Sequence, residues 1–201
     1  MSELAVATVY EAAGREGLID LALHRIVPGS RAAGPARPVM CGQDDNLMVH
    51  AAMAHARPGD VLVLTMPEPA PVALVGDLLA TQAQAQGVAA ILVDGAVRDV
   101  EELEQMGLPI WARWIRVRGA TKDIPGTIDE PVTVGGARIN TGDLVVLDGD
   151  GAAVVAAARV DEVLAASRDR LEAERVKRGK LEAGELSYDL DGLRARVEGD
   201  G

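Results

Sequence analysis

The segment from Gly76 to Glu102 constrains the fold more than any other part of the chain, because it predicts a helix, a buried strand and a charged cluster in succession. An alanine-rich helix is expected over residues 77–86, and Gly87 ends it, since glycine readily adopts the left-handed conformation that closes a helix. The apolar run 88–93 is typical of a strand buried on both faces, and Asp94-Gly95 is predicted to end it. Open α/β sheets bind ligands where such strands end.

Charged residues follow this predicted strand end directly. Arg98 and Asp99 lie just beyond it. A helix and a strand joined by a tight turn run antiparallel, so Asp77, the first helical residue, is expected beside them. The first helical turn also offers the free amides of Leu78 and Leu79, which suit a carboxylate. An arginine, an anion-binding helix start and several carboxylates together suggest a small anionic substrate and a divalent cation.

The rest of the chain predicts a mixture of parallel and antiparallel segments. The run from Gly34 to Met40 contains prolines and is therefore expected to be an edge strand. Further strands are expected at 61–65, 108–112, 144–147 and 152–155, a hairpin at 132–139, and helices at 8–15 and 47–56. These elements predict an α/β sandwich, with a core domain at residues 1–159.

The chain changes character from residue 160. A charged helix is expected over 161–180, and its apolar positions are too sparse for an ordinary core helix. We therefore expect residues 160–201 to form a helix and tail that pack on a neighbouring subunit. A fully solvated helix is the alternative.

Composition excludes several classes of protein. The net charge of −11 argues against a nucleic-acid partner, because phosphate binding needs clustered Lys and Arg. No apolar run reaches membrane length and no signal peptide is evident, so a cytoplasmic protein without a membrane partner is expected. The single cysteine, Cys41, excludes an internal disulfide framework and is expected to be an inert apolar residue.

The spacing of Asp77, the pair Arg98-Asp99 and Glu102 resembles the signature of the 4-hydroxy-4-methyl-2-oxoglutarate / 4-carboxy-4-hydroxy-2-oxoadipate aldolases. These are class II pyruvate aldolases with the fold called RraA-like, after the regulator of ribonuclease activity A. Other stretches resemble the family in the same order, at residues 7–12, 45–50, 57–63 and 142–146. The resemblance implies an RraA-like mixed-sheet α/β sandwich, of the swivelling β/β/α type, with a C-terminal helical extension.

The resemblance also implies a reaction and roles for residues. The reaction is the metal-dependent cleavage of a 4-hydroxy-2-oxo acid to pyruvate and a second oxo acid in aromatic catabolism, with an oxaloacetate decarboxylase side activity. Asp99 matches the direct ligand of Mg²⁺ or Mn²⁺, and Asp77 matches the carboxylate that holds metal-bound waters. Arg98 matches the arginine on the pyruvate oxygens, and the turn Gly76–Leu79 matches the site of the pyruvate carboxylate.

The family further implies a homotrimer or homohexamer in which an adjacent subunit adds a glutamate from its C-terminal helix. Glu174 fits that position by spacing, and Glu172 is the alternative.

The chemistry agrees with these residues. Carbon–carbon cleavage beside a 2-oxo acid leaves a pyruvate enolate, which a divalent cation and Arg98 would both stabilise. No lysine near the motif is a candidate for a Schiff base. Taken alone, Arg98-Asp99 is equally compatible with a surface ion pair, and His50 is expected to be structural or exposed.

A protein-binding regulator of ribonuclease activity without catalysis is the alternative function. By resemblance, such a regulator lacks the aspartate after the arginine and the C-terminal extension. Asp99 and residues 160–201 therefore favour an enzyme. A methyltransferase is disfavoured, because no glycine-rich nucleotide loop follows a first strand.

Overall fold

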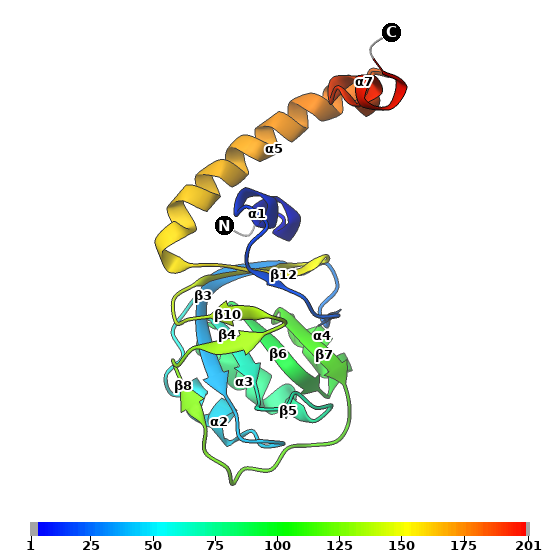
Figure 1. Ribbon diagram of the computed structural model, residues 1–201. Helices are drawn as coiled ribbons and strands as arrows, with labels where there is room; N and C mark the ends of the chain where they lie inside the picture. Colours follow the sequence, from blue (N-terminus) through cyan, green and yellow to red (C-terminus); the bar gives the residue numbers. More distant parts are fainter. Residues whose placement is uncertain (1–3, 200–201) are drawn as a thin grey trace.

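The computed structural model describes residues 4–199 (Figure 1). The strands are β1 (Leu18–Ile19), β2 (His24–Arg25), β3 (Ala32–Met40), β4 (Val61–Thr65), β5 (Ala73–Val75), β6 (Ala90–Val97), β7 (Ile110–Ile115), β8 (Thr127–Ile128), β9 (Val132–Val134), β10 (Ala137–Ile139), β11 (Leu144–Asp148) and β12 (Gly151–Val155). The helices are α1 (Val6–Ala12), α2 (Leu47–Met53), α3 (Asp77–Ala85), α4 (Val100–Met106), the 3-10 turn η1 (Ala157–Arg159), α5 (Val160–Glu182), α6 (Ser187–Leu190) and α7 (Leu193–Glu198).

The strands form a mixed sheet in the order β1-β12-β11-β3-β4-β6-β7-β2, and β9 and β10 form a separate hairpin. Strands β3, β4, β6 and β7 are parallel, whereas β11 pairs antiparallel with β3 and with β12. The α/β class with a mixed sheet and a C-terminal helix is therefore confirmed.

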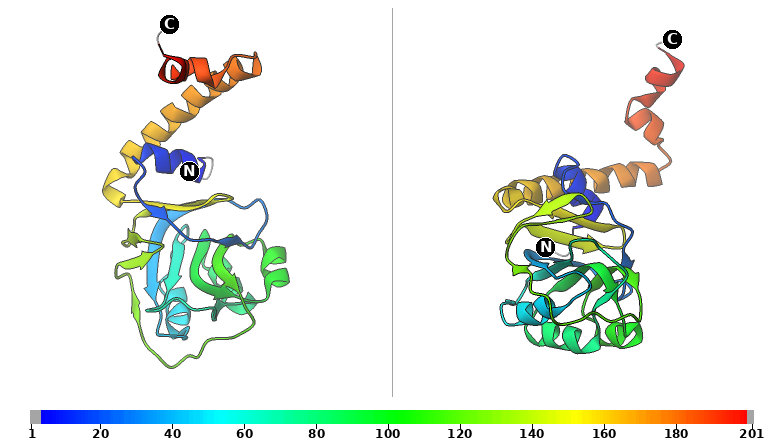
Figure 2. Two further views of the ribbon diagram at one scale, coloured as in Figure 1. Left: turned by 45° about the vertical axis from the view of Figure 1, so that its right-hand side comes forward. Right: turned by 60° about the horizontal axis from the view of Figure 1, so that its bottom comes forward.

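Alternation along the strands divides the interior into layers, because successive side chains point to opposite faces. On β4, Leu62 and Leu64 join a core with α2, α3 and α4, whereas Val61 and Val63 pack towards the hairpin and β11. The outer face of β11 and β12 packs on α1 and the start of α5. The order is therefore helices, parallel strands, a second β layer and helices again, as the two views of Figure 2 show.

The prediction that residues 34–40 form an edge strand is wrong, because β3 lies between β11 and β4. The strand changes partner halfway along. Pro35 pairs with β11, and Pro38 pairs with β4. The other side of β3 is paired only by the short β8, at Val39 and Met40. Both prolines therefore lie where one side of β3 has no paired strand, which tolerates a residue without an N–H as an edge does. The same strand joins the two β layers.

The predicted end of the buried strand at Asp94-Gly95 is also wrong, because β6 continues to Val97. Its register with β7 shifts between Val93 and Ala96. Asp94 is buried there and pairs with Arg113 of β7 at 3.0 Å. This partner from a neighbouring strand lets a carboxylate lie inside the sheet, and the chain reaches the sheet edge only at Arg98.

Helix α5 matches the predicted C-terminal helix, and Figure 1 shows it projecting from the core. Only its first turns are buried, where Val163, Leu164 and Ser167 face α1 and the second β layer. Leu171 and Val176 further along are exposed. Packing of this helix on a neighbouring subunit stays a prediction. Among residues 4–199, no helix has the length and apolar character needed to cross a membrane.

Candidate functional site

The start of α3 and the end of β6 lie side by side at the carboxyl edge of the parallel strands. The backbone amide of Asp77 donates to Asp99 Oδ2 at 3.2 Å, and the amide of Arg98 donates to the carbonyl of Val75 at 3.1 Å. Arg98 Nε lies 3.5 Å from Asp99 Oδ2. The structure thus brings together the residues that the sequence separates.

Asp99 has an unusual backbone for a residue with a side chain. Its φ of 59° and ψ of 45° are left-handed, which costs about 1–3 kcal/mol outside glycine. It occupies the N-cap position of α4, yet its carboxylate makes no hydrogen bond to that helix. The side chain points instead to the start of α3, so local helix capping does not explain the aspartate.

Gly76 makes room for this arrangement. A Cβ on Gly76 would collide with Asp99 Oδ2 and would lie 3.2 Å from Arg98 Nε. Its extended backbone suits any residue, so the requirement is space and not conformation. Gly119 limits the other side of the arginine, because a Cβ there would lie 3.0 Å from Arg98 Nη1. Side chains at either position would therefore crowd Arg98, whose own side chain is half-exposed.

We expect Gly76→Ala to displace Asp99 and Arg98 while the protein stays folded. A misplacement of about 1 Å can lower a rate roughly 100-fold. Steady-state turnover of a 4-hydroxy-2-oxo acid measures the first effect, and thermal unfolding shows whether the protein stays folded. Gly179→Ala is the matched control, because a Cβ on this helical glycine meets no atom within 4 Å. Equal turnover in both variants would show that the close approach at Gly76 is unimportant.

The predicted residues other than Asp99 and Glu174 line a cavity of about 130 Å³. We call Gly76, Asp77, Leu78, Leu79 and Arg98 its first side, and the remaining lining residues, Asn46, His50, Ala73, Ala120 and Lys122, its second side. Asn46 and His50 follow β3 as Arg98 follows β6. Since β3 and β6 both run parallel to β4, their carboxyl ends share an edge. Ligands bind at the carboxyl ends of strands in open α/β sheets. Applied to β3 as well as to β6, this rule would have predicted Asn46 and His50 at the site.

Two side chains on this second side have distinctive environments. His50, expected to be structural or exposed, is exposed and borders the cavity. Partial desolvation on the side that faces the protein, together with the charge of Lys122, lowers the pKa of His50. Asn46 Nδ2 donates to the carbonyl of Leu74 at 3.0 Å, whereas its buried Oδ1 has no partner among residues 4–199. An unpaired buried acceptor is costly and suits a donor from a bound molecule.

Comparisons with known proteins identify the family. The family model described as "RraA-like: Aldolase/RraA" matches residues 6–154. The chain belongs to this RraA-like family. A protein of Halalkalibacterium halodurans named "Putative 4-hydroxy-4-methyl-2-oxoglutarate aldolase" is 35% identical over 151 residues, covering 74% of this chain and 72% of that one.

Solved structures of RraA-like proteins share the fold. Streptomyces coelicolor RraAS2, described as an unusual member of the RNase ES inhibitor RraA protein family, has a TM-score of 0.79 and 29% identity, covering 89% of this chain and 93% of that chain. The RNA-processing inhibitor RraA from Thermus thermophilis has a TM-score of 0.69 and 26% identity, covering 75% of this chain and 92% of that chain. The RraA-like fold thus occurs in proteins named as an aldolase and as inhibitors.

The site of this RraA-like chain offers oxygen ligands for a metal. Across residues 4–199, no group of three or more His, Cys, Asp or Glu side chains is placed to hold a metal ion. Asp77 lines the cavity, whereas Asp99 lines a neighbouring hollow that shares Arg98 with it. Mg²⁺ is commonly bound by one or two carboxylates, waters and substrate oxygens. These residues therefore fit Mg²⁺ or Mn²⁺, and they do not fit a zinc site of nitrogen and sulfur ligands.

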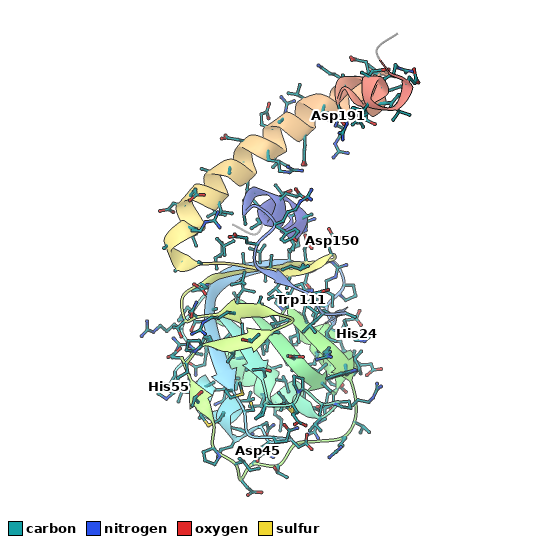
Figure 3. The ribbon with its side chains drawn as sticks, viewed as in Figure 1. His24, Asp45, His55, Trp111, Asp150 and Asp191 are labelled. Carbon is teal, nitrogen blue, oxygen red and sulfur yellow. The ribbon has the colours of Figure 1, made fainter. Side chains whose placement is uncertain are left out.

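Glu174 does not lie at the cavity of its own chain. It pairs with Arg170 on α5 at 2.9 Å, and the alternative Glu172 pairs with Arg175 at 2.7 Å. Helix α5 and Asp191 lie at the end of the molecule opposite to Asp45, whose neighbour in the chain, Asn46, lines the cavity (Figure 3). A role for either glutamate in the site of an adjacent subunit stays a prediction.

Proposed function

We propose that this RraA-like protein is a class II pyruvate aldolase, a divalent-metal-dependent carbon–carbon lyase. It cleaves a 4-hydroxy-2-oxo acid to pyruvate and a second oxo acid. The observation that carries the proposal is the strained Asp99, whose carboxylate turns away from its own helix towards Arg98 and the start of α3. The name of the relative from Halalkalibacterium halodurans supports the same activity.

The start of α3 binds the carboxylate of the pyruvate unit. First-turn amides have no partner within a helix, and the helix dipole favours an anion there. The amide of Asp77 already donates to Asp99, so the amides of Leu78 and Leu79 bind the substrate. Arg98, on the same side of the cavity, holds the pyruvate oxygens with its planar fork.

Cleavage needs a base and a means of stabilising the enolate. Mg²⁺ or Mn²⁺, when held by Asp99 and through water by Asp77, supplies Lewis-acid polarisation of the 2-oxo acid. A water held by Asp77 or Arg98 takes the proton from the 4-hydroxyl group, the bond between C3 and C4 breaks, and the electron pair forms the pyruvate enolate. Arg98 stabilises that charge. Decarboxylation of oxaloacetate leaves the same enolate and accounts for the proposed side activity.

The second side of the cavity binds the part of the substrate beyond pyruvate. Lys122 provides a cation there, next to a His50 whose pKa is lowered. A second carboxylate on the substrate is therefore favoured, as in 4-hydroxy-4-methyl-2-oxoglutarate or 4-carboxy-4-hydroxy-2-oxoadipate. A water that bridges the substrate and Asn46 can donate to the unpaired Oδ1 of Asn46.

The decisive experiment is a pyruvate-release assay on the full chain. Oxaloacetate and both 4-hydroxy-2-oxo acids are tested with Mg²⁺, with Mn²⁺ and after EDTA treatment. We expect release that requires the metal and returns when metal is restored. Full turnover in metal-free protein would contradict a class II mechanism. No release from any of these acids, combined with inhibition of a ribonuclease, would favour the regulator.

The proposed enzyme works as a homotrimer or homohexamer. Helix α5 carries Glu174 away from its own core, which suits a contribution to a neighbouring metal site. Arg98→Ala and Glu174→Ala are each expected to be inactive and to regain activity when mixed and reassembled, since some mixed sites then hold both native groups. Mixtures of Arg98→Ala with Arg98→Ala/Glu174→Ala serve as the control. Inactive mixtures with proven subunit exchange would place Glu174 outside a shared site.

A further inference from the structure

Asp45 is a buried carboxylate that the proposed reaction does not use. It is fully buried, yet no lysine or arginine pairs with it among the ion pairs of residues 4–199. Four hydrogen-bond donors replace a cation. Its Oδ1 accepts from the amide of Leu47 at 2.8 Å. Its Oδ2 accepts from Thr121 Oγ1 and the Asp123 amide, both at 2.6 Å, and from the Ile124 amide at 3.1 Å.

These donors keep the carboxylate ionised. Burial alone would raise the pKa of Asp45, but the hydrogen bonds from Thr121, Asp123, Leu47 and Ile124 outweigh it and lower the pKa to about 2. Three of the four donors belong to one segment, residues 121–124, which lies far from Asp45 in the sequence. Backbone bonds add to this contact, since the amide of Asn46 donates to Thr121 O and the amide of Thr121 donates to Asp44 O.

The segment held by Asp45 forms part of the second side of the cavity. From Arg116 to Gly126 the chain has no helix or strand, apart from isolated bridges. Ala120 and Lys122, one residue on each side of Thr121, line the cavity. Asp45 accepts hydrogen bonds from Thr121 and from Asp123, so the residues before and after Lys122 are both held in place. Figure 3 shows Asp45 at the end of the core where this loop passes.

We propose that Asp45 is a positioning residue, which holds residues 121–124 so that Lys122 faces the part of the substrate beyond pyruvate. Asp45 therefore sets selectivity and affinity for that part, whereas enolate formation depends on the other side of the cavity. The inference rests on the proposed aldolase function for its substrate, but the anchoring of the loop stands on the hydrogen bonds alone.

The central variant is Asp45→Asn. If the NH₂ group faces the loop, the three donors lose their acceptor, and if it faces the Leu47 amide, the loop keeps a neutral oxygen whose hydrogen bonds are about half as strong as those of a carboxylate. We expect KM for a 4-hydroxy-2-oxo diacid to rise about tenfold, the effect of roughly one lost polar contact. Exchange of the pyruvate methyl protons with deuterium, followed by NMR in the presence of Mg²⁺, should stay unchanged. A merely structural role would lower both activities together, and that result would overturn the proposal.

Limited trypsin digestion tests the anchor without any enzyme activity. Lys122 is exposed, and the amide that follows it is bound by Asp45. Cleavage after Lys122 should be slow in the native protein and at least about tenfold faster in Asp45→Asn, because a protease needs a locally opened backbone. Cleavage after Lys180 on α5 provides the internal reference. Equal rates after Lys122 in both proteins would overturn the anchoring role.

One further variant replaces Asp45→Asn if that variant does not fold, and another tests whether Asp45 acts through Lys122. If Asp45→Asn fails to fold, Thr121→Val removes one donor only and should shift KM and cleavage in the same directions. A double-mutant cycle with Lys122→Met shows whether Asp45 acts through that lysine: the combined rise in KM should be smaller than the product of the single rises. If the rise in KM of the double variant equals the product of the two single rises, Asp45 does not act through Lys122 and the proposal is overturned.

Asp44→Asn is the matched control. Asp44 is the neighbouring aspartate, but its carboxylate pairs with Arg118 at 3.2 Å on the surface, and asparagine tolerates its left-handed φ of 56°. It should leave KM and the cleavage after Lys122 unchanged, and a shift as large as that of Asp45→Asn would contradict the proposal. If the native protein acts on no oxo acid, the aldolase proposal fails, while the digestion still decides whether Asp45 anchors the loop.

Discussion

Asp99→Asn is expected to abolish divalent-cation binding and to lower turnover about 1,000-fold, while the fold stays intact. A metal ion contributes several kcal/mol to the stabilisation of a developing charge, and each 1.4 kcal/mol is a factor of ten in rate. Asparagine tolerates the left-handed backbone of residue 99, and its carbonyl oxygen can still accept from the Asp77 amide. The variant therefore removes the charge of the ligand and leaves its surroundings in place.

Titration calorimetry with Mg²⁺ and steady-state assays measure these two effects, with thermal unfolding as the test of folding. Asp44→Asn again provides the control, since this aspartate has a similar positive φ and its carboxylate pairs with Arg118 outside the cavity. Native affinity for Mg²⁺ in Asp99→Asn would remove Asp99 from the metal site.

Arg98→Lys is expected to lower kcat about 100-fold, with a smaller change in KM. A lysine keeps the charge but cannot direct two parallel N–H groups at the pyruvate oxygens. Groups that stabilise a developing oxyanion typically contribute 100- to 1,000-fold to kcat. A lysine would also lose the position of Nε, which lies 3.5 Å from Asp99 Oδ2.

The ratio of the two kinetic effects distinguishes catalysis from binding, because an interaction made only in the transition state changes kcat more than KM. Arg118→Lys is the control, as Arg118 is an exposed arginine of the same loop region that pairs with Asp44. Near-native kcat in Arg98→Lys would leave Arg98 with a structural role only.

The first side of the cavity could be predicted from the sequence, because its parts are close in the chain. A helix, a tight turn and a strand bring Asp77 to Arg98 and Asp99 without any long-range information. The extension of β6 could not be predicted, since Asp94 remains in the sheet only through Arg113 of another strand. The central place of β3 was hidden for a similar reason: its prolines are tolerated because β3 changes partner along its length.

The second side of the cavity was missed because its geometry depends on distant residues. Nothing in the local sequence of residues 119–126 predicts a defined conformation, and Asp45 supplies the missing hydrogen bonds from more than 70 positions earlier. Asp45 accepts from the amide of Leu47 at the start of α2, as a local helix cap would, but its second oxygen binds the loop.

The two sides of the cavity also differ in how freely they can evolve. On the first side, any side chain at residue 76 would collide with Asp99 and crowd Arg98, so this position is restricted to glycine while both residues are kept. On the second side, Lys122 projects from a segment whose backbone is tied down at its neighbours, and its own side chain carries none of those bonds. A substitution at residue 122 alone can therefore change which acids the protein binds, while the residues that form the enolate stay in place.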